Sequence, residues 1–249
     1  MTIALGERGA RGVVLDIEGT TTPVAFVYDV LFPYARVRLR EYLAENRESE
    51  ELRDVFRGLR AERLAEVVGG AAPPEIDATS GDEALGSVAT YVEWLMDRDR
   101  KSPGLKLLQG KIWERGYHDG TLRGQVFPDV PGALERWRAA GITVAIYSSG
   151  NVLAQRLLFA TTTFGDLTPL IDHFFDTGVG PKRSADSYHR IASQVHRENP
   201  ELLFISDVSA ELEAARSAGL QTLLCIRPGN DAEVTSSQDV ILTFDEIVA

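Results

Sequence analysis

The sequence predicts an α/β fold, in which a doubly wound, mostly parallel sheet contains one inserted block of helices. Three observations support this prediction. The apolar segment Val13–Leu15 ends abruptly in polar residues, as a strand buried on both faces does. Helical periodicity then extends to about Gly120, and beyond that residue strand and helix patterns alternate. Repeated strand and helix units are typical of parallel sheets with helices on both faces.

The inserted block contains four helical patterns and no convincing strand. Apolar residues recur at helical spacing in residues 27–45, 49–68 and 104–117, and in a segment that opens with the capping-box sequence Ser80-Gly81-Asp82-Glu83. We therefore expect two domains. Residues 1–22 and 121–249 form the sheet domain, and residues 23–120 form a helical domain inserted after the first strand.

The remaining strands of the sheet follow the helical block. Pro131 and Gly141 mark the two ends of a helix, because proline suits the first helical turn and glycine the position after the last. The other expected elements are strands at 142–147, 174–176, 202–205 and 221–226, and helices at 152–159, 184–198 and 210–218. The carboxyl ends of parallel strands share one edge of a sheet, where ligands bind.

Composition limits the possible partners. The net charge of −11 argues against nucleic acid or an anionic membrane surface as a partner. The single cysteine, Cys225, excludes an internal disulfide and a cysteine-rich zinc site, and its apolar neighbours indicate a buried structural thiol. The histidines show no metal-ligand spacing. Because the sequence has no long apolar segment and no basic and apolar leader, we expect a cytoplasmic protein without membrane contact.

The first candidate site surrounds Asp16. Asp16 and Glu18 directly follow the first apolar strand and lie two residues apart, so both carboxylates are expected to point into the crevice at the carboxyl end of the sheet. Gly19 lets the chain turn there and leaves backbone N–H groups free to meet an anion. The alternative is a helix-capping turn, in which Asp, Gly and Thr are also common.

Three further polar clusters follow predicted strands. Ser148 and Ser149 precede a helix and could hold a phosphate oxygen, although an ordinary helix cap also fits them. Lys182 lies in a glycine-containing loop and could direct its ammonium at an anion, although lysines are usually solvated at the surface. Asp207 is either a cap for the next helix or a metal-binding carboxylate. Together the clusters are more informative than any one of them.

The order of these clusters resembles the four motifs of the haloacid dehalogenase-like phosphatases, whose fold is a Rossmann-like sheet with an inserted cap domain. A closer resemblance, to the enolase-phosphatase family of methionine salvage, extends from Gly12 to about Asn230 and includes the helical block. The segments that support it are Asp16–Pro23, Tyr147–Asn151, Leu157–Phe159, His173–Thr177 and Arg227–Asn230. Asn151 departs from the family, in which many members have serine.

The resemblance implies a role for each candidate residue. Asp16 would be the nucleophile that forms an aspartyl-phosphate. Glu18 would act as general acid for the leaving oxygen and then as general base for water. Ser148, Ser149 and Lys182 would hold the substrate, and Ser148 and Lys182 would stabilise charge on its phosphoryl oxygens. One Mg²⁺ per subunit is expected, with Glu18 contributing either its backbone carbonyl or its side chain. The expected metal ligands are Asp16, Glu18 and Asp207.

The same resemblance implies the substrate. The expected reaction is enolisation of 2,3-diketo-5-methylthiopentyl 1-phosphate, followed by dephosphorylation to the acireductone 1,2-dihydroxy-3-keto-5-methylthiopentene in the salvage of L-methionine. Glu18 is the simpler candidate for the enolising base, and a cap residue is the alternative. The cap would hold the methylthio tail against side chains such as Phe26, Tyr28 or Trp94. We expect the enzyme to act as a monomer.

Two other functions stay open from the sequence. A phosphatase of the same superfamily with another substrate would keep all four motifs and differ only in what its cap admits. A phosphoacceptor signalling module also places an aspartate, a hydroxyl and a lysine around Mg²⁺. Such modules are small, however, and the insert of about 95 residues is too large for an ordinary loop, which makes this function the weaker alternative.

Overall fold

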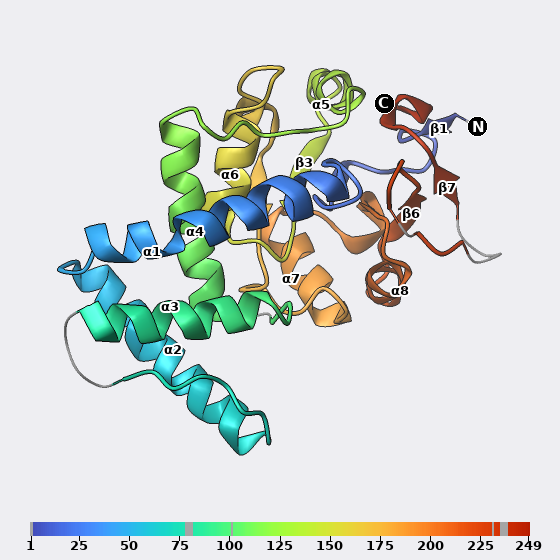
Figure 1. Cartoon of the computed structure of the whole chain (residues 1–249). Helices are drawn as coiled ribbons and strands as arrows, with labels where there is room; N and C mark the ends of the chain where they lie inside the picture. The colour runs from blue at the N-terminus through green and yellow to red at the C-terminus, as the bar shows by residue number, and fades with distance from the viewer. Residues whose placement is uncertain (1, 78–81, 101, 231, 235–238) are drawn as a thin grey trace. The chain divides into compact units, whose positions relative to one another are not determined.

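The computed structural model describes residues 2–77, 82–100, 102–230, 232–234 and 239–249 (Figure 1). The chain divides into two compact units, one formed by Met1–Val27 with Arg123–Ala249 and the other by Tyr28–Leu122. The sequence predicts two domains, with boundaries after residues 22 and 120. Whether these parts are separate domains stays a prediction. In the described part of the chain, no helix combines the length and the apolar character that crossing a membrane requires.

Six parallel strands form the main sheet of the first unit, in the order β4, β3, β2, β5, β6, β7. The central strand β2 pairs with β3 on one side and β5 on the other, so that Leu15 lies opposite Ile146 and Ile205. This arrangement confirms the predicted parallel α/β sheet. The strands are β2 (Gly12–Leu15), β3 (Thr143–Tyr147), β4 (His173–Phe175), β5 (Leu202–Ser206), β6 (Gln221–Cys225) and β7 (Val240–Ile241).

A second, two-stranded parallel sheet joins the ends of the chain. It pairs β1 (Ile3–Ala4) with β8 (Ile247–Val248). The sequence does not predict these strands or β7, because a strand of two residues is too short to show a period of two. Single 3₁₀ turns at η2 (Thr168–Leu170), η3 (Asn199–Glu201) and η4 (Phe244–Glu246) are also too short to leave a pattern.

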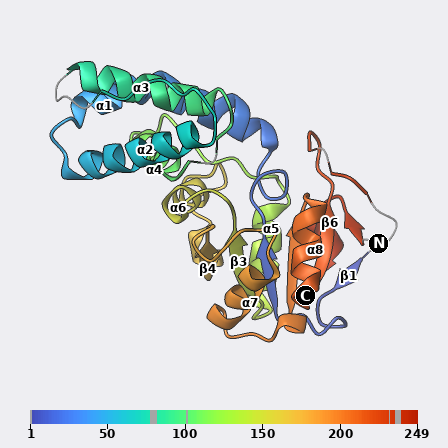
Figure 2. The same ribbon diagram turned by 90° about the horizontal axis from the view of Figure 1, so that it is seen from below.

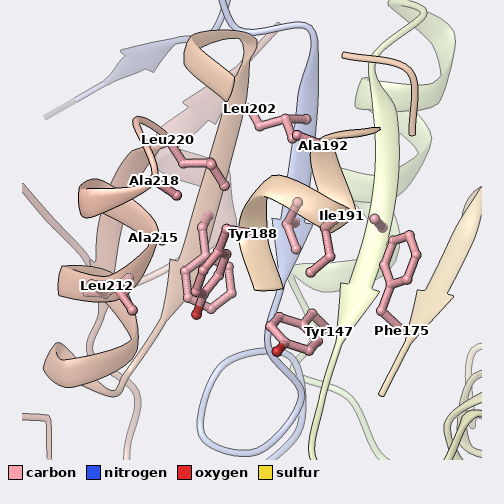
Figure 3. Packing of buried hydrophobic residues seen from close by; sticks show 14 of the residues in the cluster. Tyr147, Phe175, Tyr188, Ile191, Ala192, Leu202, Leu212, Ala215, Ala218 and Leu220 are labelled. Atoms are coloured by element: carbon pink, nitrogen blue, oxygen red, sulfur yellow. The ribbon is translucent and has the colours of Figure 1, made fainter. Parts of the chain in front are cut away.

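Helices cover both faces of the main sheet, as a doubly wound fold requires. They are α5 (Val130–Ala139), α6 (Val152–Ala160), α7 (Ala185–Gln194) and α8 (Ser209–Ser217). In Figure 2, α7 and α8 lie on the near side of the central strands and α5 is seen behind them. Tyr188 and Ile191 of α7 and Leu212 of α8 belong to one buried cluster on the face that they cover (Figure 3).

One predicted helix in this unit ends earlier than expected. The pattern of residues 184–198 predicts a continuous helix, but α7 ends at Gln194. His196 has φ +55°, in the left-handed region that ends a helix. Glycine normally marks such a position, and its absence here leaves no signal in the sequence.

The strand order places a topological switch beside β2. From β2 the chain forms β3 and β4 on one side, then returns to the other side of β2 to form β5, β6 and β7. In open α/β sheets the ligand crevice lies at such a switch, outside the carboxyl ends of the strands. Asp16 directly follows β2, so it is located at this crevice.

The second unit is helical in its described residues. It contains most of η1 (Phe26–Leu31) and the helices α1 (Phe32–Glu45), α2 (Glu50–Val68), α3 (Asp82–Met96) and α4 (Pro103–His118). α1 packs on α3 and α4, and α2 packs on α4. Ser49 and Ser102 cap α2 and α4 by accepting hydrogen bonds from Leu52 and Leu105 N–H, each at 3.0 Å. The predicted capping box at Ser80 and Gly81 lies outside the described residues.

The single helix predicted for residues 27–45 is divided. Its first part, η1, is a π-helix, and the regular helix α1 begins only at Phe32. Pro33 lies in the first turn of α1, where a missing backbone N–H is tolerated. The apolar period continues through both parts, which is why the pattern alone predicts one helix.

Candidate active site

Asp16 is almost completely buried at the end of β2, with 4% of its surface exposed. Its Oδ1 accepts a hydrogen bond from the N–H of Ile17 at 2.7 Å and lies 2.7 Å from Lys182 Nζ. Its Oδ2 accepts a hydrogen bond from Ser206 Oγ at 2.9 Å. These contacts hold a carboxylate whose burial would otherwise be costly. They also show that Asp16 caps no helix, so the capping interpretation is wrong for this residue.

Residues 17–22 form a tight turn directly after Asp16. The carbonyl of Ile17 accepts hydrogen bonds from three consecutive backbone N–H groups, at 3.2, 3.0 and 2.8 Å, which belong to Thr20, Thr21 and Thr22. Gly19 has φ +72°, and a Cβ at this position would lie 2.2 Å from Asp207 Oδ2. Both the backbone conformation and the close approach of Asp207 therefore require glycine.

The same turn is held from outside through its carbonyl groups. Three consecutive carbonyls, those of Gly19, Thr20 and Thr21, each accept a hydrogen bond from a residue more than 100 positions away. The donors are Asn230 Nδ2 at 2.8 Å, Arg227 Nε at 3.1 Å and the N–H of Phe127 at 3.0 Å. The position of the turn therefore depends on segments that follow β6 and precede α5.

Arg227 and Asp129 form a buried ion pair next to the turn. The guanidinium nitrogens lie 3.0 and 2.8 Å from the two carboxylate oxygens, and the rings of Phe127 and Phe244 lie 4.5 and 4.7 Å from Arg227 Cζ. Burial would raise the pKa of Asp129, but hydrogen bonds from Arg227 and from Phe244 N–H outweigh it and hold the pKa below its usual value. The pair therefore stabilises the fold above the unfolded-state pKa of about 3.9, and this contribution is lost as the pH falls through the lower folded-state pKa.

Lys182 connects two buried carboxylates. Its Nζ lies 2.7 Å from Asp16 Oδ1 and 2.6 Å from Glu211 Oε2, and the side chain is only 9% exposed. Burial alone would lower the pKa of Lys182, but the charges of Asp16 and Glu211 and their hydrogen bonds outweigh it, so that the pKa is raised. Lys182 is therefore a charged, buried group, and the interpretation as a solvated surface lysine is wrong.

Asp207 has one carboxylate oxygen without a hydrogen-bond partner. Its Oδ1 is buried and makes no hydrogen bond to any described residue. Burial, and then the charge of Asp16, raise the pKa of Asp207 to about 7. The N-cap position of α8 is occupied by Val208, so Asp207 is not the helix cap that the sequence also allowed. Glu18, at the start of the turn, is half-buried.

Ser148 follows β3 as Asp16 follows β2. Because Leu15 pairs with Ile146, the two polar residues lie at the same edge of the sheet. Ser148 is 8% exposed, and its Oγ accepts a hydrogen bond from the N–H of Gly150 at 3.2 Å. No hydrogen bond to Asp16, Lys182 or Asp207 is found for this hydroxyl in the described residues, so Ser148 lies at the same edge without a hydrogen bond to the charged cluster.

Asn151, and not a serine, caps the helix after β3. Its Oδ1 accepts a hydrogen bond from the N–H of Ala154 at 2.8 Å, at the start of α6. The capping interpretation of Ser148 and Ser149 is therefore wrong. Asn is as good an N-cap as Ser, so the departure of Asn151 from the family pattern preserves the function of the position. Ser149 is half-buried beside it.

Comparison with known proteins shows which family the chain belongs to. Residues 10–219 match the haloacid dehalogenase-like hydrolases. The enolase-phosphatase E1 of Synechococcus elongatus is 49% identical over 235 residues, which are 94% of this chain and 96% of that protein. The enolase-phosphatase E1 of Drosophila melanogaster is 42% identical over 231 residues, which are 91% of this chain and 87% of that protein.

The chain belongs to the haloacid dehalogenase-like hydrolases, and within them to the enolase-phosphatases. This membership confirms the resemblance seen in the sequence. Among solved structures, the UTR4 protein of Saccharomyces cerevisiae superimposes with a TM-score of 0.74 at 30% identity, over 95% of this chain and 99% of that one. The chain is therefore a hydrolase with the fold of its family.

Two parts of the enolase-phosphatase site are not singled out by the sequence. Glu211 lies in the first turn of α8, four residues after Asp207, and its Oε2 contacts Lys182. An acid in a first helical turn is usually explained by the helix dipole, which hides this role, but the spacing of four residues was a usable signal. The Arg227–Asp129 pair gives no such signal, because its members are 98 residues apart.

Replacement of Arg227 by methionine should destabilise this enolase-phosphatase by about 3–5 kcal/mol, because it leaves Asp129 buried without its partner. Urea unfolding followed by circular dichroism measures the loss. In the double variant R227M/D129N the buried charge is gone as well, so part of the stability should return.

The matched control is Arg8→Met, which removes a partly exposed pair with Asp239 at 2.7 Å in the same unit. That substitution should change the free energy of unfolding by no more than about 1 kcal/mol. If R227M were no less stable than R8M, the ion pair would not support the turn after Asp16 energetically.

Proposed function

We propose that the chain is a Mg²⁺-dependent enolase-phosphatase. It enolises 2,3-diketo-5-methylthiopentyl 1-phosphate and then releases phosphate to give 1,2-dihydroxy-3-keto-5-methylthiopentene, with the monomer as the active form. The observation that carries the proposal is a buried cluster of three charged side chains. Lys182 Nζ lies 2.7 Å from Asp16, and both groups shift the pKa of Asp207, whose Oδ1 has no hydrogen-bond partner among the described residues. The cluster thus combines a carboxylate that can attack phosphorus (Asp16), a cation for the phosphoryl oxygens (Lys182) and an oxygen that can bind a metal ion (Asp207). The choice of substrate is supported by the relatives of the chain, which are named enolase-phosphatases.

Asp16 acts as the nucleophile in this proposal. Its carboxylate attacks phosphorus, the bond to the leaving oxygen breaks, and water then releases phosphate from the aspartyl-phosphate. Contacts from Ile17, Ser206 and Lys182 hold the attacking group in one orientation, which removes the entropy cost of aligning it. Lys182 carries the positive charge that stabilises the phosphoryl oxygens in the transition state, and Ser148 and Ser149 bind the substrate at the same sheet edge.

Glu18 exchanges protons with the substrate and with water. It lies two residues after the nucleophile, and a bridge between Glu18 and Thr22 fixes its backbone in the turn. A half-buried carboxyl in that position protonates the leaving oxygen and later removes a proton from water. We assign the enolising proton transfer to the same residue, because it needs a base close to the phosphate-bearing carbon, whose proton lies next to a carbonyl group.

We assign selection of the methylthio tail to the helical unit with the residues that lead into it. The three candidate side chains, of which Phe26 belongs to the first unit, differ in exposure. Phe26 is 2% exposed and has little surface to offer. Trp94 is half-buried, stacks on Tyr91 with ring centroids 6.0 Å apart, and is covered by Arg98 at 4.4 Å. Tyr28 packs edge to face on Phe32, with ring centroids 5.3 Å apart, and at 49% exposure it is the most exposed of the three candidates.

The residues present fit a Mg²⁺ ion. The partnerless, buried Oδ1 of Asp207 is an open oxygen ligand, and Asp16 is the second carboxylate. Glu18 would contribute a third oxygen, from either its backbone carbonyl or its side chain. When bound, Mg²⁺ neutralises charge on the phosphoryl group and polarises a substrate oxygen.

The proposed function is tested with the diketone phosphate and a panel of sugar phosphates. The enzyme should release phosphate from the diketone far faster than from the sugars, as measured with a colorimetric phosphate assay. Glu18→Gln should slow phosphate release by about 10²- to 10⁴-fold and should slow solvent-deuterium exchange at the enolising carbon, followed by NMR. Glu7→Gln, which changes an exposed acid, is the control.

The outcomes separate the parts of the proposal. Faster release from a sugar phosphate would assign the chain to another phosphatase specificity. If E18Q kept deuterium exchange at the wild-type rate while losing phosphate release, the enolising base would lie in the helical unit.

Gly19→Ala should weaken Mg²⁺ binding by about 10- to 100-fold, because the new Cβ would lie 2.2 Å from Asp207 Oδ2 and displace it. Isothermal titration with MgCl₂ measures the affinity. Gly141→Ala is the matched control, since Gly141 has φ +73° and no atom within 4 Å of its added Cβ. Both variants carry backbone strain of about 1–2 kcal/mol, so equal losses of Mg²⁺ affinity would contradict the assignment of Asp207 as a ligand.

A further inference from the structure

The loop that carries Lys182 is held by side chains at four consecutive carbonyl groups. Each carbonyl from Val179 to Lys182 accepts a hydrogen bond from a different side chain. The donors are Arg190 at 2.7 Å, Tyr147 at 2.9 Å, Ser187 at 2.8 Å and Tyr188 at 2.7 Å, in the order of the carbonyls. A loop outside helices and sheets must satisfy its carbonyls elsewhere, and here the donors come from α7 and the end of β3.

The two tyrosines of this group are part of the hydrophobic core. Tyr188 is fully buried, and its ring packs edge to face on Tyr147 with centroids 5.6 Å apart. The Tyr188 ring also packs on Phe204 of strand β5, with centroids 5.1 Å apart. Figure 3 shows both tyrosines among the side chains that lie between the sheet and α7. Their rings are therefore fixed by packing, so their hydroxyl groups have little freedom to move.

Each tyrosine hydroxyl holds one loop carbonyl in place by a hydrogen bond. Tyr188 donates to the carbonyl of Lys182 itself, and Tyr147 donates to the carbonyl of Gly180. The Tyr147 ring also lies 5.8 Å from Lys182 Nζ. Gly180 has φ +135°, and a Cβ there would lie 2.3 Å from Ser187 Oγ, so the loop approaches α7 closely.

A lysine side chain needs such an anchor because its four-carbon stem is flexible. Lys182 Nζ is held at one end by Asp16 and Glu211. When an anionic group competes for the ammonium, those contacts change, and the backbone position is what remains to direct the side chain.

We propose that Tyr188 and Tyr147 are positioning residues for Lys182. Their hydroxyl groups fix the carbonyls of Lys182 and Gly180, so that the ammonium stays where it meets the phosphoryl oxygens of a bound phosphate. The inference rests on the proposed function, because it assumes that Lys182 binds phosphate. Neither tyrosine touches the substrate in this account, and both act through the lysine.

The test measures the affinity of the Mg²⁺-loaded full chain for inorganic phosphate by isothermal titration calorimetry. Tyr188→Phe keeps the ring and removes the hydroxyl, and it should weaken phosphate binding by about 5- to 20-fold. In a Lys182→Met background the same substitution should have no further effect, since there is no ammonium left to position. Tyr147→Phe, tested in both backgrounds, is the second variant and keeps the test decisive if Y188F does not fold.

Tyr117→Phe is the matched control. Tyr117 is also a buried tyrosine, but its hydroxyl has no hydrogen-bond partner among the described residues. That substitution should leave phosphate affinity unchanged. Thermal unfolding of every variant separates lost stability from lost positioning.

The outcomes distinguish this inference from the proposed function. If K182M bound phosphate as tightly as the wild type, the proposed role of Lys182 would fail and the inference with it. If K182M lost phosphate affinity while Y188F and Y147F kept it, only the positioning inference would fail. If Y188F weakened phosphate binding by the same factor with and without K182M, the tyrosine would be merely structural.

Discussion

A lysine ammonium between two buried carboxylates is the contact on which the rest of the candidate site depends. Lys182 Nζ lies within 2.7 Å of both Asp16 and Glu211, and none of these side chains exposes more than 12% of its surface. Removing three charges from water is tolerated only because each compensates the others. With Asp207 ionised, three negative charges face one positive charge. Burial, and then this excess of negative charge, raise the pKa of Asp207. The same excess is the physical reason for the cation that we propose to accompany an anionic substrate.

The two loops next to these charges are fixed in the same way, by hydrogen bonds to their backbone carbonyls. The turn after Asp16 and the loop that ends at Lys182 each present consecutive carbonyls to donors from distant parts of the fold. The donors are anchored in turn, Arg227 by its pair with Asp129 and Tyr188 by its packing on Phe204. Core packing therefore determines where the charged groups of the site lie, and a substitution far from the cluster can disturb it through these carbonyls.

The sequence predicts the sheet, its parallel strands and the clustering of Asp16, Lys182 and Asp207, because buried strands and the polar residues after them leave local patterns. It predicts poorly whatever depends on contacts between distant segments. Glu211 has the position of an ordinary acid in a first helical turn, so that only its spacing of four residues from Asp207 is a signal. Nothing in the sequence joins Arg227 to Asp129 across 98 residues. Short elements fail for a different reason, since strands such as β1 contain too few residues to show a period. The early end of α7 at a left-handed His196 likewise lacks its usual glycine signal.

The role of Asp16 is tested most directly by identifying the carboxylate that carries phosphate during turnover. Enzyme mixed with the diketone phosphate and Mg²⁺ is quenched and treated with sodium borohydride, which reduces an acyl phosphate to the corresponding alcohol. Peptide mass spectrometry then locates the modified residue. Homoserine is expected at position 16. A modified residue at any other position, or none while phosphate is released normally, would rule out Asp16 as the nucleophile.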